Sequence, residues 1–351
     1  MKSYKVTEFG QPLQVMEEAA PTPTGSEILL RVASCGVCHS DIHLHDGYFD
    51  LGGGHQLDMS KSMPLPHTLG HEIVGEVVAT GPDASGVEAG SKWLVFPWIG
   101  CGECGPCLSG NEHLCGPNKA LGVSAPGGFS DHVLVPHPRY LVDYGNVPDS
   151  VACTYACSGL TAYSALKKAE VVSDKDPVLI IGAGGVGQSA IGLCQTIYGV
   201  APTVADIDEG KREHALALGA AAVIDPAEET ARKQLLKDTG GGFGTVIDFV
   251  GAESSVAFGL SVLRKGGKLI VVGLFGGSIE IPLATVPMRA ITMSGSYVGS
   301  LAELEELAAL GREGKIPGIS VSTRDLSDVQ ETLDQLRAGK IEGRAVLQTT
   351  K

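Results

Sequence analysis

From about Pro177 onward, short apolar runs alternate with amphipathic stretches, and this alternation limits the possible folds more than any other feature. The run PVLIIGAGGVG (177–187) predicts a buried strand that ends in a glycine turn, followed by a helix that stops near Gly199. Strands that alternate with helices imply right-handed crossovers and an α/β fold with a parallel, doubly wound sheet. Further strands are expected at TVADID (203–208), AAVID (221–225), TVIDFVG (245–251), KLIVVGLFG (268–276) and ITMSGSYVG (291–299), and helices at GKREHALALGA (210–220) and SSVAFGLSVLRKGG (254–267).

The glycine turn carries a dinucleotide-binding pattern. Gly182, Gly184 and Gly187 fit G-x-G-x-x-G between a strand and a helix, and Asp206 ends the next strand about twenty residues later. The glycines permit the tight turn, the approach of a pyrophosphate and close packing of helix on strand. Asp206 would accept hydrogen bonds from ribose hydroxyls and repel a 2′-phosphate, which favours NAD over NADP; a helix N-cap is its alternative role. Lys211 either reaches a ribose hydroxyl or is a solvated helix charge.

The first 150 residues have a different character. Short β-prone runs broken by Gly and Pro predict a compact β-rich domain with irregular loops. A chain of 351 residues is long for one core, so two domains are expected. The tail after about Leu301 returns to mixed helix and strand and is expected to pack back on the first domain. The β-prone runs are EILLRVAS (27–34), EIVGEVVATG (72–81), KWLVFPW (92–98) and SDHVLVP (130–136).

Four of the nine cysteines lie close together in CGECGPCLSGNEHLC (101–115). In a reducing cytosol, clustered cysteines hold a metal more often than they form disulfides. The spacing C-x2-C-x2-C-x7-C suits a tetrahedral zinc with four thiolates, a closed and therefore structural site with no position for substrate. A redox or iron–sulfur loop is the alternative. The predicted ligands are Cys101, Cys104, Cys107 and Cys115.

The charge distribution excludes several classes of partner. The net charge is −14 and no stretch clusters Lys and Arg, so nucleic acid and anionic membranes are not expected to bind. The N-terminus lacks an apolar stretch followed by a small-residue cleavage site. No apolar run approaches the roughly 20 residues that a membrane-spanning helix needs. A cytoplasmic protein is expected.

A second set of metal-ligating residues is dispersed along the chain. The motifs are CHSDIH (38–43), GHE (70–72) and YACSGLTAY (155–163). A catalytic zinc needs three protein ligands and one open position, and Cys38, His71 and Cys157 supply such a set. Because these residues are far apart in sequence, spacing alone does not prove the site. The remaining cysteines are interpreted as packed thiols: Cys35, Cys153 and Cys194.

GVCHSD, GHE, the four-cysteine loop and the glycine turn with Asp206 occur in an order that resembles the zinc-dependent alcohol dehydrogenases of the medium-chain dehydrogenase/reductase family, of the yeast-like or bacterial tetrameric type. The match covers essentially the whole chain. It implies a GroES-like catalytic domain (1–156 and 298–351) that carries the zinc sites and a Rossmann NAD-binding domain (157–297). It also implies two zinc ions per subunit, one catalytic and one structural, and a homotetramer rather than a dimer.

The resemblance assigns roles to individual residues. Cys38, His71 and Cys157 take the catalytic-zinc positions; Glu72 lies behind that zinc and coordinates transiently or acts as a supporting acid. Asp41 orients His71. If 38–43 is helical, Ser40 and His43 share one face and form a proton relay. The cofactor contacts are assigned to His39, Thr161, Gly182, Gly184, Gly185, Val186, Gly187, Asp206, Lys211, Val272, Gly273 and Arg344.

The implied reaction is hydride transfer between an alcohol and NAD, with zinc acting on the alcohol oxygen. Trp98 and Phe49 match positions that line the substrate channel and would favour a primary or secondary alcohol with an apolar or aromatic body. The stretch around 50–66 is longer than in compact yeast-like relatives, so substrate preference does not transfer directly. The alternatives are a polyol or sugar-alcohol dehydrogenase and a noncatalytic NAD- and zinc-binding redox sensor. His45, His55, His67 and His113 are expected to be surface or loop residues.

Overall fold

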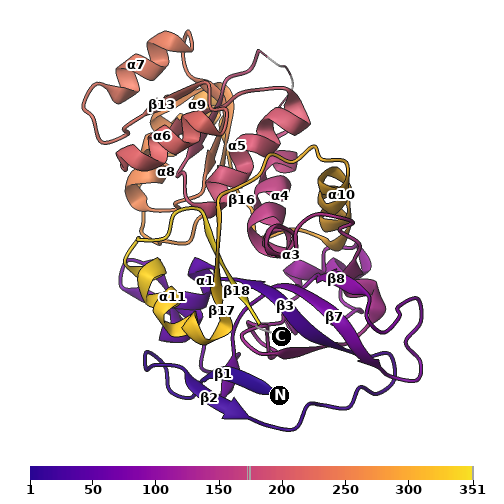
Figure 1. Ribbon diagram of the computed structural model, residues 1–351. Helices are drawn as coiled ribbons and strands as arrows, with labels where there is room; N and C mark the ends of the chain where they lie inside the picture. Colours follow the sequence, from indigo (N-terminus) through magenta and orange to yellow (C-terminus); the bar gives the residue numbers. More distant parts are fainter. Residues whose placement is uncertain (172, 174, 350–351) are drawn as a thin grey trace.

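The structure is a computed structural model and describes residues 1–171, 173 and 175–349. Two bodies of strands make up the molecule (Figure 1): a parallel sheet at the top of the view and a mainly antiparallel sheet below it. The chain passes from the lower body to the upper one and then returns, so that both the first and the last strands lie in the lower body.

The upper body is a six-stranded parallel sheet in the order β13-β12-β11-β14-β15-β16. Its strands match the predicted alternation, and the parallel, doubly wound architecture is confirmed. The strands are β11 (Val178–Ile181), β12 (Thr203–Ala205), β13 (Ala222–Ile224), β14 (Phe243–Asp248), β15 (Leu263–Val271) and β16 (Thr292–Gly295), and the helices are α5 (Gly185–Tyr198), α6 (Glu209–Ala217), α7 (Ala231–Asp238), α8 (Glu253–Val262) and α9 (Thr285–Arg289).

One predicted boundary is wrong. The helix expected over 254–267 ends at Val262, and β15 begins at Leu263. Leu263 pairs with Phe243 of β14, and Gly266 adopts a positive φ of 72° that a continuing helix does not tolerate. Pairing with β14 therefore overrides the apolar helical pattern in this stretch.

The lower body is a seven-stranded sheet in the order β10-β8-β7-β3-β18-β17, with β9 also paired to β3. A three-stranded sheet, β2-β1-β6, and a separate hairpin, β4-β5, complete it. The strands are β1 (Lys2–Val6), β2 (Gln14–Glu17), β3 (Ile28–Gly36), β4 (Tyr48–Gly52), β5 (His55–Asp58), β6 (His67–Thr68), β7 (Glu72–Thr80), β8 (Lys92–Val95), β9 (His132–Val135), β10 (Leu141–Val142), β17 (Val321–Asp325) and β18 (Arg344–Gln348).

The C-terminal strands return to the first body, as predicted. β18 pairs antiparallel with β3 and parallel with β17. The helices outside the parallel sheet are α1 (His39–Asp46), α2 (Gly105–Leu108), α3 (Asp149–Thr154), α4 (Leu160–Ala169), α10 (Leu301–Arg312) and α11 (Val329–Arg337), with a π-turn, η3 (Tyr155–Gly159), between α3 and α4 and 3-10 turns η1 (Glu112–Leu114), η2 (Pro138–Tyr140) and η4 (Leu326–Asp328).

The core runs through both bodies. Ile180 of β11 belongs to an apolar cluster that continues into the lower body through residues such as Leu160 and Ile73. Its neighbours Leu179 and Ile181 point to the other face of the parallel sheet and form a second cluster there. This alternation is expected for a strand that is covered on both faces. No helix in the described part of the chain is both long and apolar enough to cross a membrane.

Candidate active site and metal centres

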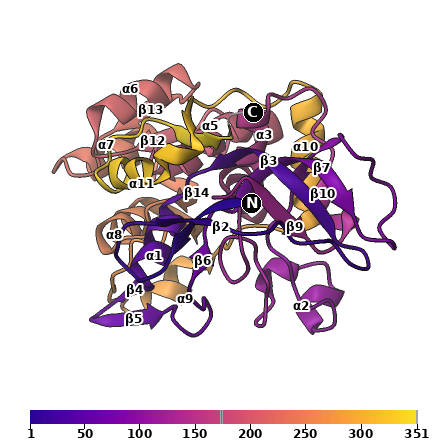
Figure 2. The same ribbon diagram turned by 60° about the horizontal axis from the view of Figure 1, so that its bottom comes forward.

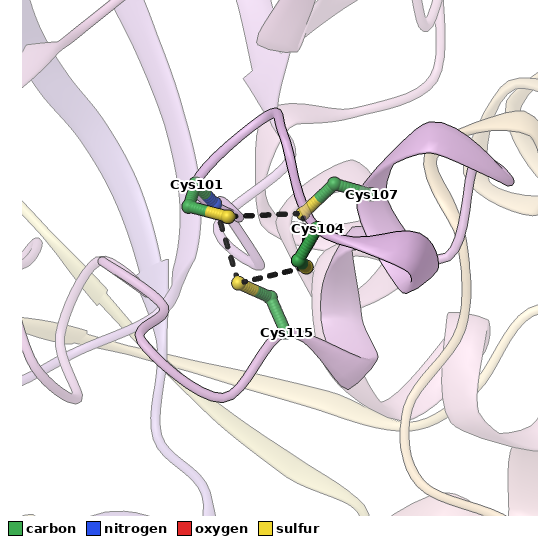
Figure 3. Close-up of side chains that lie close together, drawn as sticks. All are labelled: Cys101, Cys104, Cys107 and Cys115. Atoms are coloured by element: carbon green, nitrogen blue, oxygen red, sulfur yellow. Dashed lines mark hydrogen bonds between the residues drawn. The ribbon is translucent and has the colours of Figure 1, made fainter.

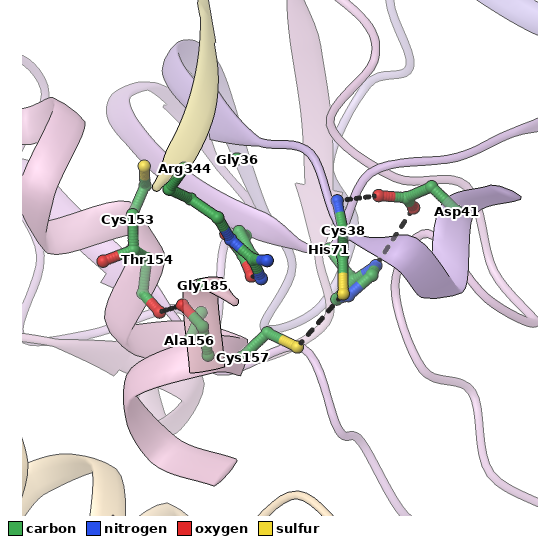
Figure 4. A network of polar contacts seen from close by, with 12 residues as sticks. Gly36, Cys38, Asp41, His71, Cys153, Thr154, Ala156, Cys157, Gly185 and Arg344 are labelled. Carbon is green, nitrogen blue, oxygen red and sulfur yellow. Dashed lines mark hydrogen bonds and ion pairs between the residues drawn. The ribbon is translucent and has the colours of Figure 1, made fainter. Parts of the chain in front are cut away.

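A buried cluster of metal-ligating groups lies where the two bodies meet (Figure 4). Cys38 is the N-cap of α1, directly after β3, and His71 and Glu72 stand at the start of the neighbouring strand β7. Cys157 comes from the π-turn η3. The ligand atoms of these four residues lie within 4.8 Å of one another, and all four side chains are buried. The structure therefore brings the dispersed predicted ligands together.

Asp41 ties this cluster to the first turn of α1. Its carboxylate accepts hydrogen bonds from the backbone N–H of Cys38 (2.8 Å) and of Gly70 (3.3 Å). One of its oxygens also lies 3.2 Å from Nδ1 of His71. The other ring nitrogen of His71, Nε2, is buried and has no hydrogen-bond partner among the described residues. A carboxylate on one nitrogen and a free second nitrogen are typical of a metal-ligating histidine.

The two cysteines of the cluster lie within hydrogen-bonding distance of each other. Their sulfur atoms are 3.9 Å apart. A hydrogen bond from the Cys157 thiol holds the pKa of Cys38 well below its ordinary value, against the opposing effect of burial, and the charges of Arg344 and His71 add to this. The same interaction, together with burial, raises the pKa of Cys157 well above its ordinary value. One sulfur is thus already suited to bind a cation as thiolate.

Glu72 is held by a buried ion pair that crosses a strand. Arg344, on β18, donates from Nε to the Glu72 carboxylate at 3.1 Å, and one terminal guanidinium nitrogen makes a second contact. The strand between them is β3, and its Gly36 pairs with Glu72. A Cβ at Gly36 would lie 2.0 Å from a Glu72 oxygen, so this ion pair requires glycine there. Burial raises the pKa of Glu72, and Arg344 opposes that shift.

The residues of this cluster fit zinc. Two sulfurs, a carboxylate and a buried imidazole nitrogen without a protein partner are the donors that zinc takes in catalytic sites. The Cys38–Cys157 separation of 3.9 Å is close to the roughly 3.8 Å between two sulfurs bound tetrahedrally at 2.3 Å.

The four-cysteine loop forms a second cluster (Figure 3). The sulfur of Cys104 lies 3.4 Å from that of Cys107 and 3.7 Å from that of Cys115, and Cys101 lies 3.9 Å from Cys107. A disulfide would need about 2.05 Å, so the sulfurs are unbonded; all nine cysteines of the chain are free. These separations fit four thiolates around one tetrahedral zinc.

Glu112 supports this loop, a role that the sequence analysis missed. Its buried carboxylate accepts hydrogen bonds from the backbone N–H of Gly100 (3.0 Å) and from the hydroxyl of Tyr140 (2.8 Å). Arg139 pairs with its other oxygen at 2.9 Å. The loop is thereby attached to η2. An acidic residue inside a cysteine loop gives no sequence signal for this role, because its partners lie outside the loop.

The predicted relay residues lie along α1. The segment 39–46 is helical, as the relay requires, and Ser40 and His43 are both half-buried. Burial lowers the pKa of His43. Phe49 packs on the imidazole, with the ring centroids 4.8 Å apart. No hydrogen bond joins Ser40 to His43 in the part of the chain that the structure describes.

Two aromatic side chains flank the metal-ligating groups. The predicted Trp98 is buried, lies with its ring 5.4 Å from that of His71, and donates from Nε1 to the Ala156 carbonyl at 2.9 Å. The sequence analysis missed Tyr297, which meets Trp98 edge to face at 5.9 Å. Tyr297 follows β16, so only the fold brings it to Trp98.

The glycine turn has the predicted geometry. Gly182 adopts a φ of 91°, and a Cβ at Gly187 would lie 1.9 Å from the Gly182 carbonyl oxygen. Gly184 is the N-cap of α5. Asp206, at the end of β12, accepts hydrogen bonds from the backbone N–H of Ala183 (2.7 Å) and of Asp208 (2.9 Å). Turn and carboxylate thus stand together at one edge of the parallel sheet, where dinucleotides bind.

Most other residues predicted to contact the cofactor lie around this edge. A Cβ at Gly185 would lie 3.3 Å from a guanidinium nitrogen of Arg344. Arg344, which also pairs with Glu72, therefore links the glycine turn to the buried cluster. The N–H groups of Val272 and Gly273 donate hydrogen bonds to the Asp248 carbonyl, at 2.8 and 3.1 Å. The remaining members are Thr161, buried on α4; Val186, half-buried on α5; His39, exposed on α1; and Lys211, half-buried on α6.

Three histidine predictions are wrong. His45, His67 and His113 are buried, and only His55 is exposed as expected. His45 hydrogen-bonds the Gln11 carbonyl at 2.8 Å, which compensates its burial. The three remaining cysteines, Cys35, Cys153 and Cys194, are buried as predicted.

Known proteins resemble this chain over its full length. A family described as "Alcohol dehydrogenase GroES-like domain" matches residues 24–148, and one described as "Zinc-binding dehydrogenase" matches 185–313. An "NAD-dependent alcohol dehydrogenase" of Sulfurisphaera tokodaii is 33% identical over 99% of both chains, and an "Alcohol dehydrogenase" of Geobacillus stearothermophilus is 32% identical over 99% of both. The crystal structure of the alcohol dehydrogenase of Aeropyrum pernix superposes with a TM-score of 0.89, at 30% identity, over 99% of this chain and 100% of that one.

Proposed function

The chain belongs to the zinc-type alcohol dehydrogenases of the medium-chain dehydrogenase/reductase family, and on this premise we propose that it interconverts an alcohol and its aldehyde or ketone with NAD. The observation that carries the proposal is the meeting of Cys38, His71 and Cys157 in one buried cluster beside Trp98. We further propose the division into a catalytic domain, 1–156 with 298–351, and a cofactor domain, 157–297.

The buried cluster and the glycine turn would hold the two groups that the reaction needs. Cys38, His71 and Cys157 would bind zinc, with Glu72 behind it, and the turn with Asp206 would bind NAD. When bound, zinc supplies Lewis-acid stabilisation of charge on the substrate oxygen and NAD accepts the hydride. The protein itself excludes water from the cluster, because the cluster is buried beneath Trp98.

The proton of the alcohol leaves along α1. Ser40 Oγ is the first hydroxyl on this helix after the ligand Cys38, and His43 lies one turn further on the same face. Burial lowers the pKa of His43, so its ring is neutral at physiological pH and able to accept a proton. Asp41, on the opposite side of the same turn, keeps His71 in place as a ligand.

The substrate is an alcohol with an apolar or aromatic body. Trp98 and Tyr297 form an aromatic wall next to the metal-ligating groups. A polyol dehydrogenase would present polar side chains there, so this alternative is less well supported. Phe49 packs on His43 and is proposed to border the channel on the relay side.

A metal measurement combined with a substrate screen tests the proposal. The pure protein is expected to contain two zinc ions per subunit and to reduce NAD with short aliphatic or benzylic alcohols, read as the absorbance of NADH. Turnover of polyols alone would favour the polyol dehydrogenase. Bound cofactor without turnover of any alcohol would favour the noncatalytic redox sensor.

Cofactor preference is tested at Asp206. The carboxylate lies at the ribose edge of the glycine turn, so Asp206→Ala is expected to lower the NAD/NADP preference by roughly tenfold or more, the worth of one charge-assisted contact. Kinetic constants for both cofactors measure this. Asp208→Ala, which removes the N-cap of α6 instead, is the matched control and should leave the preference unchanged. An unaltered preference in Asp206→Ala would show that this carboxylate does not select the cofactor.

We propose that the protein is a homo-oligomer, with a tetramer favoured over a dimer. The strand β16 is the edge of the parallel sheet, and exposed apolar side chains gather in the same stretch of chain. Light scattering tests this, and Met293→Lys on β16 is expected to dissociate the assembly. The exposed apolar residues are Leu274, Phe275, Leu283, Val286, Met288, Met293 and Tyr297.

A further inference from the structure

The hairpin β4-β5 of the lower body touches a loop of the upper body through glycine backbones. A Cβ at Gly52 would lie 2.4 Å from the carbonyl carbon and oxygen of Gly277. From the other side, a Cβ at Gly276 would lie 2.5 Å from the carbonyl oxygen of Asp50. The two backbones can be this close only because neither position carries a side chain. Figure 2 shows the hairpin in the region of α1, α8 and α9.

The loop on the upper side is firmly attached to the cofactor edge of the parallel sheet. It follows Val272 and Gly273, which were assigned to the cofactor. The N–H of Gly276 donates to the Gly251 carbonyl at 3.0 Å, and Gly276 forms a bridge with Ala252. Movement of this loop would therefore require movement of the sheet edge itself.

The hairpin on the lower side is attached to the relay helix. The N–H of Met59, just after β5, donates to the carbonyl of Gly47, the C-cap of α1, at 2.9 Å. Phe49 of β4 packs on His43. Beside the glycine contact, the ring of His39 at the start of α1 lies 6.1 Å from that of Phe275. The hairpin thus joins the relay helix to the loop that follows the cofactor residues.

We propose that Gly52 and Gly276 are positioning residues of a latch between the two domains, which closes when the hairpin meets 276–277 and parts when the cofactor enters or leaves. This inference rests on the proposed function, because it takes NAD as the ligand of the glycine turn. The latch lies in the stretch by which the chain departs from its compact relatives. In many enzymes, the opening of such a contact before the product can leave is the step that limits the turnover rate.

Two variants that differ only in the contact test the latch. Gly52 has a φ of 82° and Gly54 a φ of 81°, so alanine is strained equally at both; a Cβ at Gly54 meets nothing within 4 Å. The rate of NADH dissociation is measured by stopped-flow fluorescence. Gly52→Ala is expected to release NADH at least about fivefold faster than the wild type, the lower end of coupling between sites, and Gly54→Ala at the wild-type rate. Equal rates in the two variants would overturn the latch.

A reciprocal variant tests the same contact from the loop. Gly276→Ala, whose Cβ would lie 2.5 Å from the Asp50 carbonyl oxygen, is expected to match Gly52→Ala. Because both substitutions break one contact, the double variant should release NADH no more than about twofold faster than the faster single variant. Multiplicative effects would mean that the two glycines act independently, which contradicts a shared latch.

A readout without cofactor separates this inference from the proposed function. Lys61 is exposed just after the hairpin, and trypsin should cut there faster in Gly52→Ala than in Gly54→Ala, both without cofactor. Equal cleavage would count against the latch. If the wild type fails to bind NADH while the two variants still differ in cleavage, the proposed function is refuted and the contact between hairpin and loop stands.

Discussion

The two cysteine clusters differ in where along the chain their ligands come from and in what surrounds them. The cluster of Cys101 to Cys115 draws its ligands from one loop, and Cys101 is exposed. The cluster of Cys38, His71, Glu72 and Cys157 draws on three separate segments and is wholly buried. Both offer sulfur donors at about 3.9 Å separation, so the ligand atoms do not distinguish them.

Their surroundings do distinguish them. In the buried cluster, His71 and Glu72 each have a partner of opposite charge: Asp41 lies against His71, and Arg344 pairs with Glu72. A buried charge is tolerated only with such partners. The four-cysteine loop needs less compensation, because water reaches one side of it. The charges of the buried cluster thus have partners within the protein, whereas the four-cysteine loop is partly open to water.

The sharpest test of this difference is Cys38→Ala. Loss of a thiolate ligand should abolish turnover, by at least about a thousandfold, because the metal supplies several kcal/mol of charge stabilisation to the transition state. The four-cysteine loop is untouched, so the fold should remain. Turnover is measured with the best alcohol of the screen, and circular dichroism reports the fold. Retained turnover would refute the assignment of this cluster.

Removal of Arg344 tests how much its ion pair with Glu72 contributes to stability. Arg344→Met leaves Glu72 buried without its cation and is expected to lower the free energy of unfolding by about 3–5 kcal/mol. Urea unfolding measures the loss. The double variant Glu72→Gln with Arg344→Met should recover part of it, because no uncompensated charge remains.

The ion pair between Arg139 and Glu112, beside the four-cysteine loop, provides the control. Arg139 pairs with Glu112 but is half-exposed, so Arg139→Met should cost only about 1 kcal/mol or less. Similar losses in Arg139→Met and Arg344→Met would erase the contrast between the clusters.

Cys104→Ala should have the opposite signature from Cys38→Ala. The loop loses one of four sulfurs and its zinc, which should lower the free energy of unfolding by about 3 kcal/mol, as losses of structural metals do. The molecules that remain folded should turn over substrate at a near-normal rate. Thermal unfolding, zinc content and turnover per folded molecule are compared. Loss of turnover with unchanged stability would exchange the roles of the two clusters.

The same contrast explains which of the two ligand sets could be predicted from the sequence alone. The four-cysteine loop was predicted from its spacing, since all ligands are local. The ligands of the buried cluster lie up to 119 positions apart, so their residue types suggest the site but their spacing does not establish it without the family resemblance. The alternation after Pro177 predicted the parallel sheet for the same local reason.

What the sequence missed depends on strand register. Gly36 matters because β3 lies between β7 and β18, so that Glu72 and Arg344 meet above it. Tyr297 meets Trp98 only because β16 ends beside the first domain. Neither contact has a periodic or spaced signature. The helix predicted over 254–267 is wrong only in its last five residues, where pairing with β14 outweighs the local helical pattern.

The last prediction concerns His67, a buried histidine that lacks an acidic partner such as the one His71 has. His71 faces Asp41, but His67 faces the cation of Lys5, which itself pairs with Glu18 at 2.6 Å. Burial, with Lys5 adding to it, lowers the pKa of His67 to about 4. The unfolded chain binds this proton below about pH 6.5, so the stability that His67 contributes is complete above that pH and is lost as the pH falls toward 4.

Between pH 7 and pH 5 this loss should be about 2 kcal/mol. Urea unfolding at both pH values measures it. His67→Leu, which cannot bind a proton, should show a loss smaller by that amount, and the exposed His55→Leu should behave as the wild type. A wild-type loss that persists in His67→Leu would place the acid sensitivity elsewhere, with protonation of the metal-ligating thiolates as the next candidate. In that case the burial of His67 without an acidic partner would not be the cause of the acid sensitivity.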